Sequence, residues 1–94
     1  METKNSKIWL VSPKNFIGKE EYYYTKFIIV GEFIPEILES LYQYVYNKED
    51  FTIPFYLRSS NLKITNIGEI NINLDNQKLI KDFPILAATY EYKI

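Results

Sequence analysis

Two pairs of adjacent acids are the first candidates for chemistry in this 94-residue sequence: Glu20-Glu21 and Glu49-Asp50. Both pairs lie in stretches typical of loops. General acid–base catalysis needs acids that converge in a pocket with shifted pKa values, whereas neighbouring acids in a loop point into solvent. The pairs therefore indicate solvated loops, and we expect no catalytic residue among them.

An asparagine-rich segment at 71–76 has the oxygen-bearing side chains that Ca²⁺ and Mg²⁺ prefer. Its apolar residues, however, continue an alternation that runs through Ile70, Ile72 and Leu74. A strand with one solvated face explains the intervening asparagines without a metal ion. The sequence has no Asp-x-Asp or Glu-x-x-Asp spacing either. We therefore expect no metal site and no cofactor.

The sequence contains no histidine and no cysteine. This composition excludes a Cys/His zinc site, a Ser-His-Asp triad and a thiol nucleophile. It also excludes disulfide bonds, which favours an intracellular setting. The three glycines are isolated from one another, so there is no glycine-rich phosphate-binding loop. We interpret the protein as not being an enzyme.

The charges are balanced, with twelve acidic against eleven basic residues and a formal net charge of -1. Nucleic-acid-binding domains usually carry a basic face rich in arginine, and Arg58 is the only arginine here. The segment 58–61 (Arg-Ser-Ser-Asn) could bind an anion, but a hairpin turn explains it equally well. The apolar runs are too short for a signal peptide or a membrane span. The composition thus argues against nucleic acid and membrane as partners.

Nine tyrosines are the most unusual feature of the composition. Tyrosine provides rigid, amphipathic contact area and is enriched at protein–protein hot spots. We expect Tyr22, Tyr24, Tyr46 and Arg58 to form the contact set for a protein partner, with Trp9 added if the first strand lies at a sheet edge.

Tyr90 and Tyr92 have the alternate spacing that could stack successive bases of a single-stranded nucleic acid. They also share parity with Leu86 and Ile94, so we expect them to face the core.

The sequence predicts a single globular domain over 1–94, with residues 1–6 frayed. The segment 7–12 is predicted as a short strand. The segment 22–33 is apolar on both parities, as in a strand covered on both faces, and we place it centrally. The segment 35–47 repeats apolar residues with the period of a helix, with Pro35 in the first turn.

The second half of the chain is predicted to consist mainly of strands. The segment 51–58 alternates, and Pro54 within it suggests an edge strand. The segment 62–74 fits one bent strand or two strands joined near Gly68. After a possible helical turn before Pro84, 86–94 alternates again.

These elements predict an α+β fold with the order β-β-α-β-β-β. About five strands form a mostly antiparallel sheet, and one amphipathic helix (35–47) packs on one face. A ferredoxin-like sandwich is the second choice. It needs a full second helix near 76–83, where the sequence predicts only one helical turn.

Abundant Ile, Lys, Tyr and Asn beside scarce Ala, Gly, Pro and Arg indicate an AT-rich genome. We interpret the protein as a small non-enzymatic protein–protein interaction module in the cytoplasm. One concrete version is a phage or mobile-element inhibitor that blocks a host defence protein by occupying its surface in the host cytoplasm. One alternative is a homo-oligomeric structural or accessory protein, such as a homodimer paired through the 7–12 strand. A further alternative is a single-strand nucleic-acid binder that stacks bases on tyrosines.

Overall fold

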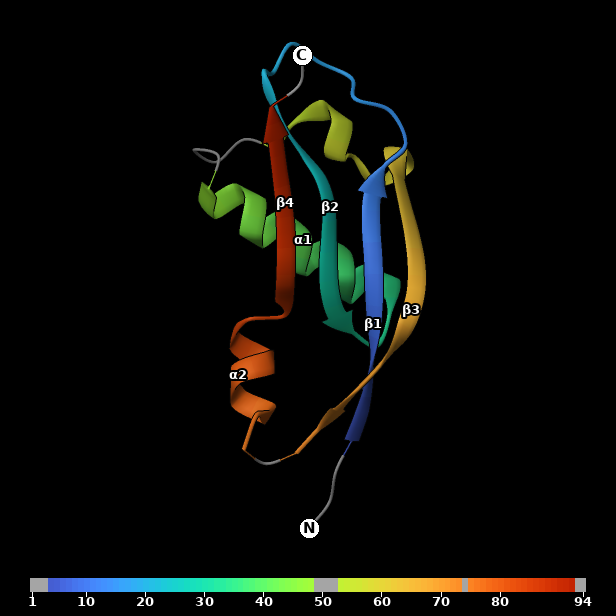
Figure 1. Ribbon diagram of the computed structural model, residues 1–94, viewed down its shortest axis with the longest axis vertical. Coiled ribbons are helices and arrows are strands. Elements are labelled where there is room, and N and C mark those ends of the chain that lie inside the picture. Colours follow the sequence, from blue (N-terminus) through green and yellow to red (C-terminus); the bar gives the residue numbers. More distant parts are fainter. Residues whose placement is uncertain (1–3, 49–52, 74, 93–94) are drawn as a thin grey trace.

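The computed structural model describes residues 4–48, 53–73 and 75–92, and it has the predicted α+β class (Figure 1). Its strands and helices follow one another along the chain as β1 (Lys4–Pro13), β2 (Tyr22–Gly31), α1 (Ile34–Lys48), β3 (Leu62–Ile72), α2 (Gln77–Asp82) and β4 (Ile85–Tyr92). Two short 3-10 turns, η1 (Phe55–Leu57) and η2 (Ser59–Asn61), precede β3.

The strands form one sheet with the order β3-β1-β2-β4, in which every neighbouring pair is antiparallel. The central position predicted for 22–33 is confirmed, because β2 pairs with β1 on one side and β4 on the other. The predicted 7–12 strand corresponds to β1, which is also internal. β3 and β4 are therefore the edges of this sheet, and the predicted pairing of two copies through the 7–12 strand is wrong, because β1 has a neighbouring strand on each side.

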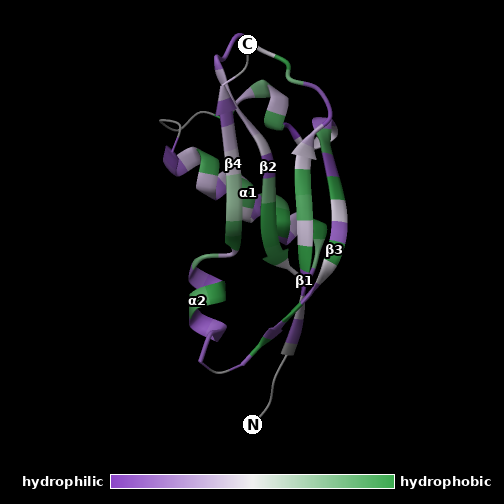
Figure 2. Cartoon of the chain, viewed as in Figure 1, coloured by the Kyte–Doolittle hydropathy of each residue, from purple (hydrophilic) through white to green (hydrophobic). Residues whose placement is uncertain are grey.

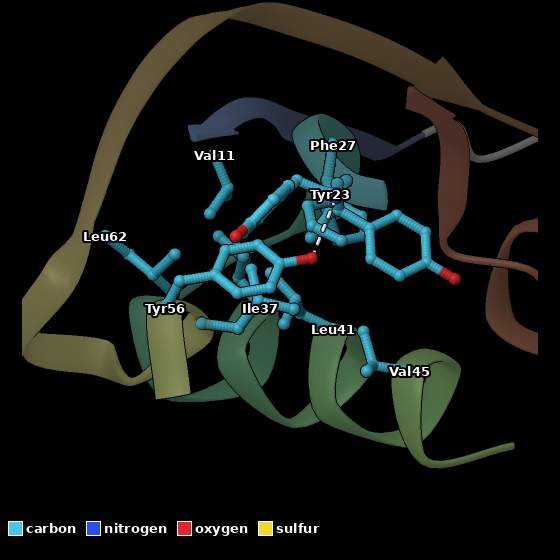
Figure 3. Packing of buried hydrophobic residues seen from close by; sticks show 11 residues of the cluster. Val11, Tyr23, Phe27, Ile37, Leu41, Val45, Tyr56 and Leu62 are labelled. Carbon is cyan, nitrogen blue, oxygen red and sulfur yellow. Dashed lines mark hydrogen bonds between the residues drawn. The ribbon is translucent and has the colours of Figure 1, made fainter. Parts of the chain in front are cut away.

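Helix α1 crosses behind the sheet and covers one of its faces (Figure 1). It extends the predicted 35–47 helix by one residue at each end. Its apolar stripe places Ile37, Leu41 and Val45 in the core with no exposed surface (Figure 3). At its start the Glu36 carboxylate accepts the backbone N–H of Glu32 at 3.1 Å, which satisfies a donor beside the first turn.

The strand predicted for 51–58 is wrong in its described part, 53–58, where the chain forms turn η1. The reason is Tyr56, which points into the core and is 1% exposed. Burial of this large ring stabilises the turn. A single extra strand at the sheet edge would gain less from its hydrogen bonds to one neighbouring strand. Residues 51–52 lie outside the described residues. In the described part of the chain the sheet therefore has four strands, where about five were predicted.

The choice between one and two strands over 62–74 is settled in favour of one bent strand, β3, for the described part up to Ile72. Ile67 is an extra residue opposite β1, because Ile8 pairs with Gly68 while Trp9 pairs with Asn66. Gly68 has φ +153° at this bulge, a conformation that favours glycine.

The described elements run β-β-α-β-α-β, and the short helix α2 lies where a helical turn before Pro84 was predicted. The ferredoxin-like alternative is wrong, because β1 and β2 are neighbours with no helix between them.

Hydrophobic residues concentrate on β1 and β2, as Figure 2 shows. The core lies between these strands and α1, closed at one end by Tyr56 and Leu57. On the opposite face Ile8, Leu10 and Ile28 are half-buried, whereas Val30, the register partner of Ile8, is 4% exposed. Both parities of β2 therefore contain buried residues, although α1 covers only one face. Neither helix within the described ranges has the length and apolar character needed to cross a membrane.

Candidate functional site

Four tyrosines from β2 and β4 gather at one corner of the sheet; we refer to Tyr22, Tyr24, Tyr90 and Tyr92 as the tyrosine cluster. The ring centroids of Tyr22 and Tyr92 are 5.1 Å apart, those of Tyr22 and Tyr90 5.7 Å, and those of Tyr24 and Tyr90 4.5 Å. These are distances at which aromatic pairs attract each other beyond their burial. The rings therefore form one continuous surface rather than isolated contacts.

The register of the two strands produces this cluster. Tyr22 lies opposite Tyr92, and Tyr24 lies opposite Tyr90. Because side chains alternate between the faces of a sheet, residues two apart on each strand share a face. Two Tyr-x-Tyr segments paired antiparallel therefore bring four rings together on one face.

The cluster has a buried base and an exposed top. Tyr24 is 5% exposed and stacks on Phe27 with 5.1 Å between ring centroids. Tyr22, Tyr90 and Tyr92 are 49%, 49% and 57% exposed. The cluster thus joins three half-exposed rings to Tyr24, which is part of the core.

Tyr56 fixes the position of this base. β1 pairs with β2 only from Gly31 to Phe27, so β1 offers no partner to the start of β2. In its place the Tyr56 hydroxyl accepts the backbone N–H of Tyr24 at 2.8 Å within the core (Figure 3). A side chain from η1 thereby completes the hydrogen bonding of the strand that carries two members of the cluster.

Asn61 in turn holds the η1 segment in place. Its side-chain amide donates to the carbonyl oxygens of Tyr56 at 2.7 Å and Asn15 at 2.6 Å, and the residue is 9% exposed. The backbone carbonyl of Asn61 accepts the backbone N–H of Lys14 at 2.7 Å. These bonds tie the chain after β1 to the turn before β3, which makes the support beneath Tyr24 rigid.

The five residues predicted as a contact set do not come together. Tyr22 and Tyr24 meet in the cluster, the first exposed and the second buried. Tyr46 is exposed on α1, and Arg58 is exposed between η1 and η2. Trp9 lies on a central strand and donates its indole N–H to the Gly31 carbonyl at 2.9 Å. The condition on which Trp9 was included, an edge position for its strand, is not met.

Arg58 lies beside a shallow hollow of about 270 Å³ lined by Tyr42, Ile53, Ser59 and Ser60. Its guanidinium carbon stands 3.9 Å from the centre of the Phe55 ring, a cation–π contact. The Tyr42 hydroxyl donates to the Leu57 carbonyl at 3.1 Å, and burial raises the pKa of that phenol. These contacts give the segment structural roles that require no anion.

A larger groove of about 610 Å³ lies between α1 and the start of β4. Glu36, Glu39 and Asp82 line it together with Lys48. Across the described ranges, however, no three acidic, histidine or cysteine side chains are grouped so that they could hold a metal ion. The groove thus offers polar walls without a metal-binding set.

The acids and asparagines singled out in the sequence have local roles where they are described. The Asn73 side-chain oxygen accepts the N–H groups of Asp75 at 2.9 Å and Asn76 at 3.0 Å, which forms the turn before α2. Glu20 and Glu21 are exposed between β1 and β2. The pair at 49–50 lies outside the described residues.

Sequence reasoning missed Tyr90 and Tyr92, which we expected to face the core. Their parity is on the helix side of the sheet, but the rings lie where that face is open. The usable signal is the match between two Tyr-x-Tyr segments, at 22–24 and 90–92, which an antiparallel pairing of the strands predicted at 22–33 and 86–94 would align.

Comparisons with known proteins give no relative from which a role could be taken: no family model, no curated protein and no solved structure matches this chain.

Proposed function

We propose that this protein is a non-enzymatic binding module that contacts another protein through the tyrosine cluster and the adjoining strand β4. The observation that carries the proposal is the placement of Tyr22, Tyr90 and Tyr92, half-exposed, at β4, the outermost strand of the described sheet on this side. Tyrosine contributes large contact area at a low cost in side-chain entropy. An anchored ring loses less freedom on binding than a mobile one, because its neighbours already hold it.

The charges around the cluster favour a protein over a nucleic acid. Glu91 is the only charged residue within β4, and Lys26 is the only one within β2. A single-strand binder combines stacking rings with a basic groove that follows the phosphates. Here the one arginine, Arg58, lies on the η1–η2 segment and stacks on Phe55.

Site-specific photocrosslinking in the organism that encodes the protein tests this proposal. We replace Tyr92 with p-benzoylphenylalanine, which keeps an aromatic ring at the same place. The matched control carries the same group at Tyr46, an exposed tyrosine of α1. Irradiation is expected to yield a protease-sensitive, nuclease-resistant adduct from position 92 and much less from position 46.

The chemical class of the adduct decides the outcome. A protein adduct, with this chain or with another, supports the proposal. A nuclease-sensitive adduct contradicts it in favour of base stacking, and equal adducts from both positions show that the cluster is not the contact surface. The narrower hypothesis of an inhibitor of a host defence protein rests on the amino-acid composition, which indicates an AT-rich genome, and stays a prediction.

A further inference from the structure

We propose that the partner of β4 is a second copy of this chain, which pairs antiparallel with it about a two-fold axis at Tyr90. This inference rests on the proposed function, since it names the partner of the same surface. Its first basis is a contrast between the two edges of the sheet. β3 carries Lys63 and Glu69, and a bulge at Ile67 bends it, both of which discourage edge pairing.

β4 lacks these protective features over its regular part. From Ala87 to Tyr92 its only charge is Glu91, it contains no proline, and its one bulge residue, Leu86, lies before this stretch. Such an edge presents a row of backbone donors and acceptors to another strand. Among the described strands none pairs with the outer side of β4, and this edge also carries Tyr90 and Tyr92.

The hydrogen bond to Tyr56 shows which backbone groups of β4 point outward. The Tyr24 N–H points away from β4, toward Tyr56. In an antiparallel ladder two opposed residues either bond each other or both point away. Tyr90, opposite Tyr24, therefore directs its backbone groups to the outer side, and so do Ala88 and Tyr92 two residues away.

This alternation restricts the registers of a symmetric pair. Outward-directed residues must face outward-directed residues, so an axis at Tyr90 pairs Tyr90 with its own copy and Ala88 with Tyr92 of the partner copy. An axis at Thr89 also satisfies the alternation, but it sets Tyr92 against the bulge at Leu86. An axis at Glu91 sets like charges against each other. The axis at Tyr90 is the register that avoids both conflicts.

Side-chain sizes fit this register. Each Tyr92 ring lies opposite the small Ala88 of the partner copy, which leaves room for it. The two Tyr90 rings meet at the axis, so the tyrosine clusters of both copies join into one aromatic row. The exposed upper part of each cluster is thereby covered by its equivalent.

Charge complementarity supports the same register. Glu91 faces Thr89 of the partner copy, and within that copy Thr89 pairs with Lys26. Glu91 and the partner's Lys26 are then two strand spacings apart, about 10 Å between Cα atoms. Glutamate and lysine side chains span this distance over the threonine, and both residues are exposed.

A charge-swap series measured by sedimentation equilibrium tests the proposal on the purified full chain. The wild type is expected to move from one chain of 11.2 kDa toward twice that mass as the concentration rises through the micromolar range. Glu91→Lys sets lysine toward lysine at two symmetric positions and should weaken the dimer about tenfold. The double variant Lys26→Glu/Glu91→Lys should restore it. Lys63→Glu on the β3 edge is the matched control and should change nothing.

Amide hydrogen exchange gives a second readout that does not depend on the charges. The Ala88 and Tyr92 amides should become protected as the concentration rises, while the Glu91 amide, which points toward β2, should be protected throughout.

A monomer at high micromolar concentration overturns the proposal, as does a dimer that Lys63→Glu disrupts and Glu91→Lys does not. These results leave the proposed function standing if crosslinking at position 92 captures a different protein. Loss of both the dimer and the position-92 adduct overturns both.

Discussion

The hydroxyl of Tyr56 should contribute measurably to stability, because it completes the hydrogen bonding of β2 from outside the sheet. The substitution Tyr56→Phe removes the acceptor of the Tyr24 N–H, a 2.8 Å bond in a buried setting. The ring itself stays, so its packing against Tyr23, with 4.9 Å between centroids, is kept. A buried donor that loses its acceptor costs about 1–3 kcal/mol, so we expect a loss of about 2 kcal/mol in the free energy of unfolding.

Urea denaturation followed by circular dichroism measures this loss, and thermal unfolding should show a fall in Tm of roughly 8–16 °C. Tyr92→Phe is the matched control, since it removes an exposed hydroxyl and should change the free energy of unfolding by less than about 0.5 kcal/mol. Faster exchange of the Tyr24 amide in Tyr56→Phe would locate the defect. If Tyr56→Phe is as stable as wild type, the hydroxyl does not complete the strand and the reasoning is refuted.

Three further substitutions test other parts of the fold. Asn61→Ala removes the side-chain amide that donates to the Tyr56 and Asn15 carbonyls and should cost about 2–3 kcal/mol by urea denaturation; a loss below about 0.5 kcal/mol, roughly that of a surface change, would show that Asn61 does not hold the η1 segment in place. Gly68→Ala should cost about 1–3 kcal/mol although nothing lies within 4 Å of the added Cβ, because φ +153° strains an L-residue; an unchanged midpoint would show that the bulge relaxes. Burial raises the pKa of Tyr42 above its ordinary 10.0, so the folded state favours the protonated phenol. Its contribution to stability is complete below pH 10.0 and is lost as pH rises through the folded-state pKa; Tyr42→Phe should flatten this decline, and equal pH slopes for both proteins would contradict the assignment.

The sequence patterns predicted those elements in which the spacing of apolar residues along the segment determines which side chains are buried. The stripe through Ile37, Leu41 and Val45 identified α1, and the two apolar parities of 22–33 identified a central strand. In both cases the residues that determine the element also make its contacts. The prediction for 51–58 failed because alternation is a local property, whereas the position of Tyr56 depends on Tyr24, which is distant in sequence.

The same reasoning predicted only half of the tyrosine cluster: it included Tyr22 and Tyr24 and left out Tyr90 and Tyr92. Parity assigned Tyr90 and Tyr92 to the helix side, but parity does not show how far along the sheet a helix extends. Of the α1 residues, Tyr44 reaches Tyr24 with 6.2 Å between ring centroids, and the rings above it stay exposed. The edge position considered for Trp9 is wrong because the strand order, which makes β1 internal, depends on pairings that no single segment encodes.

The most direct test of the central claim compares photocrosslinking yields at positions 92 and 46, normalised to the amount of folded protein. If the tyrosine cluster is the binding surface, position 92 gives a discrete protein adduct and position 46, an exposed tyrosine on α1, gives little. A position-92 adduct that nuclease destroys, or equal yields from the two positions, would contradict the claim that this corner of the sheet binds a protein.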